Sequence, residues 1–188
     1  MHTDTKRPDS KPQAGTGRDK PRVEAYPFKL DAVVLSGTHQ NTKRLIMGRN
    51  KAFLKLGGQV LVRYVVEALL KAESIDQIFV VGPAEELLQE LSGFPSSVHV
   101  IAQRGKMLTN SWAGIEAAED RHRNDPSMPV GERPLLITSC DLPLVTALSI
   151  DDFVKRCAIE DYASTKKYAM LAGVVDEPGV RPFYPKEG

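Results

Sequence analysis

Stretches of nearly continuous apolar residues recur along the chain. They alternate with stretches in which apolar residues recur at helical spacing. The run 30–35 (LDAVVL) ends at a Ser-Gly pair and is typical of a strand buried on both faces of a sheet. Runs of the same kind predict four further strands, at 77–82, 98–102, 134–139 and 168–175.

Helices are predicted between these strands. After a double-glycine turn, apolar residues recur at helical spacing. Pro83 suits the first position of a helix because its missing N–H is not needed there, and Ser149 suits an N-cap. We expect helices at 60–73, 83–91, 109–123 and 149–159.

The alternation of strand and helix indicates the α/β class. It predicts a three-layer α/β/α fold in which helices cover both faces of a mostly parallel, Rossmann-like sheet. Ligands bind such sheets outside the carboxyl ends of the strands, so chemistry is expected in the segments that follow the strands.

Residues 1–27 are polar and carry hardly any apolar side chain. Such a segment cannot bury enough surface to offset its ordering entropy, so we expect a disordered tail followed by one domain at 28–188. The net charge of +1 gives no strong field for nucleic acid or a membrane surface. Two cysteines make no disulfide framework, and no apolar run approaches the roughly 20 residues of a membrane helix. We therefore expect a cytoplasmic protein that binds neither nucleic acid nor a membrane.

The segment 35–51, after the first strand, is rich in small residues and cations. Backbone N–H groups in a glycine-containing turn form an anion site, and cations beside it would neutralise a polyphosphate. The segment matches neither the Walker A loop nor the dinucleotide fingerprint, and a solvated basic loop explains its composition equally well. Its cations are Lys43, Arg44, Arg49 and Lys51.

Asp141 follows the fourth strand and would lie at the ligand-binding edge of the sheet. Magnesium prefers one or two carboxylates together with phosphate oxygens and water. Taken alone, an aspartate shortly before Pro143 is better explained by a turn. The neighbouring Cys140 has no evident histidine and acid partners, so we do not expect it to act as a nucleophile.

The order of residues in the first loop is informative as well. It reads Leu35-Ser36-Gly37-Thr38, then Arg44, Met47-Gly48 and Lys51. This order resembles the signature of the nucleotidyltransferases related to the molybdenum-cofactor guanylyl- and cytidylyltransferases, the MobA-like family, and Asp141-Leu142-Pro143 resembles the family's Asp-x-Pro. The resemblance implies a fold of the glycosyltransferase-A type. It also implies magnesium-dependent transfer of a nucleoside monophosphate from a nucleoside triphosphate, CTP or GTP favoured, to a phosphorylated acceptor, with release of pyrophosphate.

The resemblance further implies roles for single residues. Lys51 would contact the triphosphate, Arg44 would stabilise charge during transfer, and Asp141 would hold Mg²⁺. The loop departs from the family at Thr38, where a second glycine is usual, and in its length before Arg44, so Lys43 would also suit the role of Arg44. The residues implied in nucleotide binding are Leu35, Ser36, Gly37, Thr38, Lys51, Gln103, Asn110, Ser111 and Gly114.

Several alternatives stay open. Thr109 or Asn110 would equally suit a plain N-cap. In the family a second acidic residue, later in the chain, completes the metal site, and Asp176 is the candidate here; without such a residue the chain would be a catalytically incomplete nucleotide-binding module. A dinucleotide-dependent oxidoreductase is disfavoured by the absent glycine fingerprint. The chain is short after its fifth predicted strand, and an unpaired sheet edge would favour a homodimer.

Overall fold

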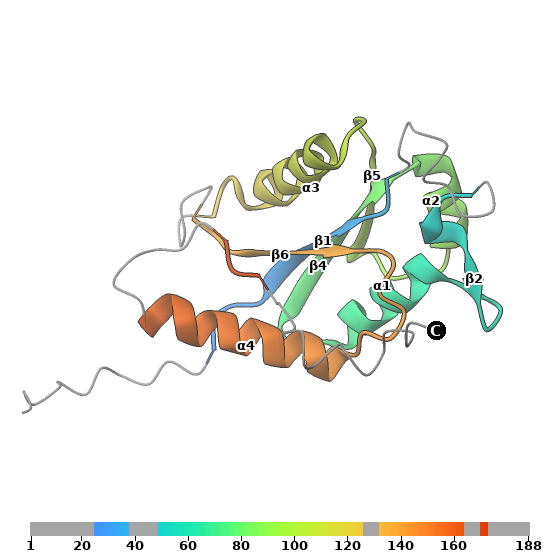
Figure 1. The fold of residues 1–188 in the computed structure, drawn as a ribbon. Helices are drawn as coiled ribbons and strands as arrows, with labels where there is room; N and C mark the ends of the chain where they lie inside the picture. Colours follow the sequence, from blue (N-terminus) through green and yellow to red (C-terminus); the bar gives the residue numbers. More distant parts are fainter. Residues whose placement is uncertain (1–24, 38–48, 126–131, 164–169, 173–188) are drawn as a thin grey trace, which may run out of the picture.

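A computed structural model describes residues 25–37, 49–125, 132–163 and 170–172 of the chain (Figure 1). Strands and helices follow one another throughout these ranges. In chain order they are β1 (Leu30–Leu35), the 3-10 helix η2 (Lys51–Phe53), β2 (Lys55–Leu56), β3 (Gln59–Val60), α1 (Leu61–Lys71), β4 (Ile75–Gly82), α2 (Ala84–Glu90), β5 (Val98–Ala102), α3 (Met107–His122), β6 (Leu135–Ser139) and α4 (Ala147–Ala163).

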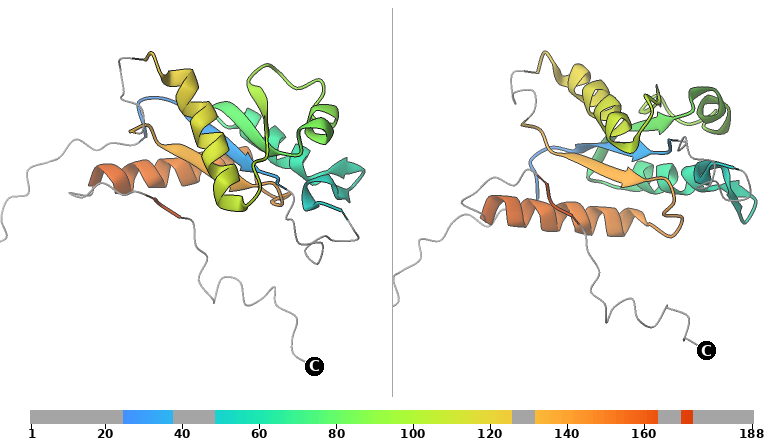
Figure 2. Two further views of the ribbon diagram at one scale, coloured as in Figure 1. Left: turned by 90° about the horizontal axis from the view of Figure 1, so that it is seen from above. Right: turned by 45° about the horizontal axis from the view of Figure 1, so that its top comes forward.

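The central sheet is parallel, with strand order β5-β4-β1-β6. Helix α3 covers one face, and helices α1 and α4 cover the other (Figure 1 and Figure 2). The predicted three-layer α/β/α fold is therefore confirmed. Because these strands all run in one direction, their carboxyl ends lie along a single edge of the sheet.

Strand β1 lies inside the sheet and is buried on both faces, as its nearly continuous apolar sequence predicts. Ala32 and Val34 belong to the core that contains residues of α1 and α4, whereas Val33 belongs to the core beneath α3. All three side chains are fully buried. Burial of one valine stabilises a fold by roughly 1.5–3 kcal/mol, so this strand anchors both layers.

Gly114 lets helix α3 lie close to β1. A Cβ atom at this position would overlap Cγ1 of Val33 and would lie 3.1 Å from Cγ2 of Val81. Helix–sheet packing thus accounts for the glycine, and its contact with a nucleotide stays a prediction.

We expect Gly114→Ala to destabilise the fold by about 1–3 kcal/mol, the usual cost of overpacking a core. At an exposed helical position the same change would stabilise by about 1 kcal/mol, because alanine is the better helix former. Urea unfolding measures the difference, with Ser111→Ala on the same helix as the control. If Gly114→Ala were as stable as the wild type, α3 would have to shift away from β1 without cost.

The start of α1 differs from the prediction of a helix from Val60. Val60 instead pairs with Lys55 in the short hairpin of β2 and β3, which the sequence pattern missed. The hairpin turns at Gly57 and Gly58, whose φ angles are 58° and 91°. These left-handed values favour glycine, so the double glycine forms a hairpin turn and the helix starts only afterwards.

The predicted N-cap at Ser149 was wrong, because α4 begins two residues earlier. Thr146 occupies the cap: its Oγ1 accepts the N–H of Ser149 at 3.2 Å, and its own N–H donates to Ser149 Oγ at 3.0 Å. Ser149 is therefore the third residue of the helix and the reciprocal partner of the cap, as in a capping box.

Two predictions fall largely outside the described residues. Of the expected tail, residues 1–24 are not described, while Tyr26 stacks on Phe28 with ring centroids 5.7 Å apart. Of the expected strand 168–175, only residues 170–172 are described, and none of these is in a strand. No helix in the described ranges is both long and apolar enough to cross a membrane.

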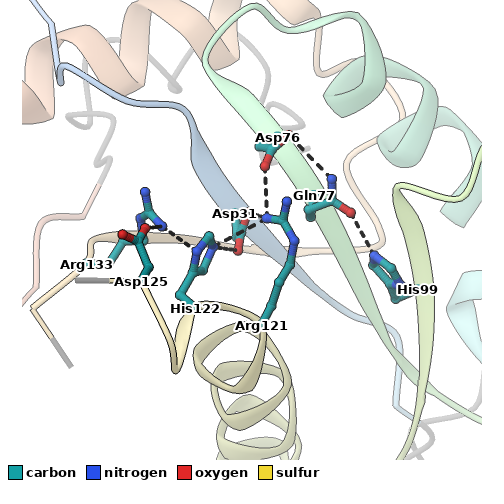
Figure 3. A network of polar contacts seen from close by, with 8 residues as sticks. All are labelled: Asp31, Asp76, Gln77, His99, Arg121, His122, Asp125 and Arg133. Carbon is teal, nitrogen blue, oxygen red and sulfur yellow. Dashed lines mark hydrogen bonds and ion pairs between the residues drawn. The ribbon is translucent and has the colours of Figure 1, made fainter. Parts of the chain in front are cut away.

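A network of charged side chains joins the amino ends of the strands to the carboxyl end of α3 (Figure 3). Asp31 of β1 is only 1% exposed and accepts hydrogen bonds from Arg121 Nη1 at 3.3 Å and from His122 Nε2 at 2.8 Å. Arg121 also pairs with Asp76 of β4 at 2.9 Å, and Arg133 donates to Nδ1 of His122. This network lies at the edge of the sheet opposite the carboxyl ends.

Candidate functional site

The segments that follow β1, β4 and β6 meet at the carboxyl edge of the sheet. Leu35, the last residue of β1, is aligned with Val81 on one side and with Ser139 on the other. Backbone hydrogen bonds continue this alignment beyond the strands, since the N–H of Ser36 donates to Val81 and the N–H of Cys140 donates to Leu35. The ends of the first and fourth predicted strands are therefore neighbours.

Ser36 is held tightly at the exit of β1. Its side chain is 1% exposed, and its Oγ donates to the carbonyl oxygen of Val81 at 2.9 Å. A Cβ atom at Gly82 would lie 2.7 Å from this hydroxyl, so the two strand ends leave no room for a side chain there. The hydroxyl of Ser36 thus fixes the strand end from which the predicted phosphate loop departs.

Lys51 and Asp141 are 90 residues apart in the sequence and meet at this edge. The ammonium Nζ of Lys51 lies 3.2 Å from Oδ2 of Asp141. The two side chains are 50% and 31% exposed, so a ligand can reach both. The structure therefore brings together the predicted triphosphate contact and the predicted metal ligand.

The carboxylate of Asp141 is held in its charged form. Ser139 donates a hydrogen bond to Oδ1, and this bond, followed by the ammonium of Lys51, lowers the pKa of Asp141 below the usual aspartate value. Asp141 is therefore ionised at neutral pH, which is the state that binds a cation.

Cys140, beside Asp141, lies in the core. It is 5% exposed, and burial together with the neighbouring charge of Asp141 raises the pKa of its thiol to about 12. A protonated, buried thiol is a poor nucleophile, which supports the expectation that Cys140 does no covalent chemistry.

Three predicted nucleotide contacts lie together beside the first loop: Gly37, Gln103 and Asn110. A Cβ atom at Gly37 would overlap Nδ2 of Asn110 and would lie 3.4 Å from Oε1 of Gln103. Asn110 is buried, and its Oδ1 accepts the N–H groups of Arg104 at 2.7 Å and Gly105 at 3.2 Å. Asn110 therefore shapes the turn between β5 and α3, and the missing side chain of Gly37 gives that turn room beside the exit of β1.

The remaining predicted site residues divide into two groups. Ser111 lies within α3, where its Oγ donates to the carbonyl of Met107 at 3.1 Å. The others fall outside the described residues, so their predicted roles stay predictions. They are Thr38, Lys43, Arg44 and Asp176.

The chemistry of this edge suits a metal that arrives with its substrate. Among the residues that the structure describes, no group of three or more His, Cys, Asp or Glu side chains is arranged to hold a metal ion. Magnesium bound beside a nucleotide needs only one or two carboxylates, since phosphate oxygens and water complete its shell. Asp141 fits such an ion.

Two residues of the site were not predicted from the sequence. Asn50 donates from Nδ2 to the carbonyl of Ser36 at 2.8 Å and accepts the N–H of Ala52 on Oδ1 at 3.0 Å. Asparagine is a favoured cap, so its place before Lys51 was an available signal. For Ser139, which holds Asp141, the sequence offered no signal.

Comparison with known proteins identifies the family of the chain. The sequence profile described as the MobA-like NTP transferase domain matches residues 32–178, which is most of the chain. Two curated relatives are 2-C-methyl-D-erythritol 4-phosphate cytidylyltransferases, from Rhodococcus jostii (strain RHA1) and Rhodococcus opacus (strain B4). Each is 31% identical over 77 residues, which is 41% of this chain and 34% of the relative. The match thus spans about a third of the length of these relatives.

A solved structure of similar fold is that of a nucleotidyl transferase from Methanothermobacter. It superimposes with a TM-score of 0.52 and is 22% identical, over 68% of this chain and 57% of the other. At this identity the likeness concerns the fold, and it agrees with the parallel sheet and its covering helices.

Proposed function

Because the chain belongs to the MobA-like NTP transferase domain family, we propose that it moves a nucleoside monophosphate from a nucleoside triphosphate to a phosphorylated acceptor and releases pyrophosphate. The observation that carries the proposal is the contact between Lys51 and Asp141 at the carboxyl edge of the sheet. It joins a cation suited to phosphates and a carboxylate suited to a metal, at the edge where α/β sheets bind their ligands.

CTP and GTP are the favoured donors. The relatives named as cytidylyltransferases support CTP, and the sequence resemblance to guanylyl- and cytidylyltransferases supports either. The base would bind near Gly37, where Gln103 and Asn110 lie close to the exit of β1. Hydrogen bonds to the base edge would then select the nucleotide.

In the proposed reaction, an oxygen of the acceptor phosphate attacks the α-phosphorus of the triphosphate. The bond to the bridging oxygen breaks, and that oxygen leaves with pyrophosphate. No proton needs to move, because the attacking phosphate is already ionised. The work of the protein is positioning and charge stabilisation. Lys51 would shift its ammonium from Asp141 to the phosphates, and Arg44 would balance the charge that builds up during transfer.

Magnesium is the expected cofactor, and Asp141 would hold it together with phosphate oxygens. When bound, the ion supplies positive charge beside the triphosphate. Asp141 suits this task because its lowered pKa keeps it ionised. The hydrogen bond from Ser139 to Oδ1 leaves Oδ2, the oxygen now beside Lys51, to face the ion once the ammonium has moved to the phosphates.

The proposal is tested by thermal unfolding with CTP, GTP, ATP, UTP or NAD, each with and without magnesium. A ligand that binds only the folded state at about 100 times its Kd raises the apparent stability by about 2.7 kcal/mol. We expect a magnesium-dependent shift with one triphosphate, much reduced in Lys51→Ala and kept in Lys71→Ala. Lys71 is an exposed lysine at the end of α1 and serves as the matched control. A shift with NAD, or the absence of a shift with every triphosphate, would refute the proposed site.

A catalytically incomplete nucleotide-binding module is the second candidate. Its support is that the family's second acidic metal ligand has Asp176 as its candidate here, and Asp176 lies outside the described residues. Such a module would give the same thermal shift but would release no pyrophosphate with any phosphorylated acceptor. Pyrophosphate release therefore separates the two functions.

A further inference from the structure

Asn50 bridges the two ends of the segment that leaves β1 and returns at Lys51. One side-chain atom, Nδ2, donates to the carbonyl of Ser36 at 2.8 Å, which is 14 residues earlier. The other, Oδ1, accepts the N–H of Ala52 at 3.0 Å. A single amide thus joins the exit of the strand to the turn that carries Lys51.

Both ends of this bridge are firmly anchored. Ser36 is tied to Val81 by its N–H and by its hydroxyl, each at 2.9 Å. On the other side, Ala52 is fully buried, and the carbonyl of Asn50 accepts the N–H of Phe53 at 3.1 Å. The side chain of Lys51 is the half-exposed part of this turn, and it is directed at Asp141.

The position of Asp141 is fixed by the same strand. The N–H of Cys140 donates to the carbonyl of Leu35, the residue before Ser36. The distance between the ammonium of Lys51 and the carboxylate of Asp141 therefore depends on how the turn is held against the exit of β1. Among the described residues, the side-chain hydrogen bonds of Asn50 join the turn directly to this strand exit.

We propose that Asn50 is a positioning residue, which sets the ammonium of Lys51 against Asp141 by bridging the Ser36 carbonyl to the Lys51–Phe53 turn. The consequence for catalysis rests on the proposed nucleotidyl transfer, in which Lys51 contacts the triphosphate. The bridge itself is a property of the free protein and can be tested without a nucleotide.

The first measurement is competitive acylation of lysines, read by mass spectrometry as the reactivity of Lys51 relative to Lys71. In the wild type the ion pair with Asp141 protects the Lys51 amine. We expect Asn50→Ala to raise the relative reactivity of Lys51 about two- to fivefold, the range that loss of an exposed ion pair allows. Asn124→Ala, at an exposed asparagine of the turn after α3, is the matched control and should leave the ratio unchanged.

Asn50→Ser separates the bridge from a plain helix cap. Serine caps a helix well but is too short to reach the carbonyl of Ser36 as well. We expect Asn50→Ser to raise the reactivity of Lys51 as Asn50→Ala does. If either Asn50→Ser or Asn50→Ala keeps the wild-type ratio of Lys51 to Lys71 reactivity, the positioning role is overturned.

The second measurement is nucleotide affinity in Asn50→Ala, Lys51→Ala and the double variant. Asn50→Ala should weaken binding about two- to tenfold, the range of one net hydrogen bond, and should cost nothing further once Lys51 is alanine. Additive losses would show that Asn50 acts independently of Lys51, against the proposal. If the wild type binds no triphosphate while Asn50→Ala still exposes Lys51, the nucleotidyltransferase proposal fails and the positioning role stands.

Discussion

Asp141→Asn is expected to lower kcat/KM for nucleotidyl transfer by about 10²- to 10³-fold, comparable to the loss of one preorganised charge-stabilising group in other enzymes. The amide keeps the shape of the side chain and can still accept a hydrogen bond from Ser139, but it carries no charge. The ammonium of Lys51, 3.2 Å away, then loses this ionic partner, and a magnesium ion loses its carboxylate ligand.

The effect should not come from unfolding. Asp141 and Lys51 form a partly exposed ion pair, and such pairs contribute at most about 1 kcal/mol to stability. Rates of pyrophosphate release, measured at saturating and at limiting magnesium, should therefore fall while the urea midpoint changes little. Asp152→Asn, at an exposed carboxylate of α4 paired with Arg156, is the matched control.

The pH dependence gives a second check on Asp141. Its pKa is lowered, so the carboxylate stays ionised from neutral pH down to below the usual aspartate value. The stability and charge that it contributes are thus present above the pKa of an unfolded aspartate and are lost as the pH falls through the lower, folded value. Titration of Asp141 should therefore cause no loss of wild-type activity between pH 8 and pH 6. A loss in this range that is absent from Asp141→Asn would contradict this expectation. Such a loss would assign a different ionisation to this carboxylate.

The sheet was predictable because its strands are apolar runs buried on both faces. The bounds of β1 and β5 agree with the prediction, and β6 differs by one residue. β4 begins at Ile75, two residues before the expected start at Gln77, because the polar Asp76 interrupts the apolar pattern. Within the strand Asp76 pairs with Arg121, and a pattern of hydrophobicity contains no information on that pairing.

Helix starts were less predictable, because capping preference describes only local hydrogen bonding. α3 begins at Met107, with Lys106 at the cap position and no side-chain capping bond. The preference for Thr109 or Asn110 as a cap was misleading. The side chain of Asn110 bonds the backbone of the preceding turn, including Gly105, and so supports the turn from within the helix.

In the candidate site, too, local sequence pointed to single residues but not to the contacts between distant residues. The order of residues and the family resemblance pointed to Lys51 and Asp141, which the fold brings together. The contacts that hold these residues join positions far apart in the sequence, such as Ser36 with Asn50. Periodicity and composition do not report such contacts, because these depend on where a loop returns after leaving the sheet.

The opposite edge of the sheet carries the largest expected effect on stability. Asp31 is 1% exposed, and its two oxygens accept from Arg121 and His122. The guanidinium of Arg133 can only donate, so Nδ1 of His122 must accept, and Nε2 of His122 carries the proton that is donated to Asp31. One carboxylate therefore orients two side chains of α3 against β1.

Asp31→Ala is expected to destabilise the fold by about 3 kcal/mol, at the lower end of the cost of breaking a buried charged pair. The remaining partners would be left beside an emptied, buried site, although Arg121 would keep its contact with Asp76 and so limit the loss. Urea unfolding at pH 7 measures this change. The control is Asp120→Ala, which removes an exposed carboxylate of α3 that is paired with Arg123. This change should cost less than about 1 kcal/mol. If the two variants were equally stable, Asp31 would be solvated in solution and would not anchor α3 to the first strand. A large loss confined to Asp31→Ala would mean that this buried carboxylate anchors the carboxyl end of α3 to the first strand.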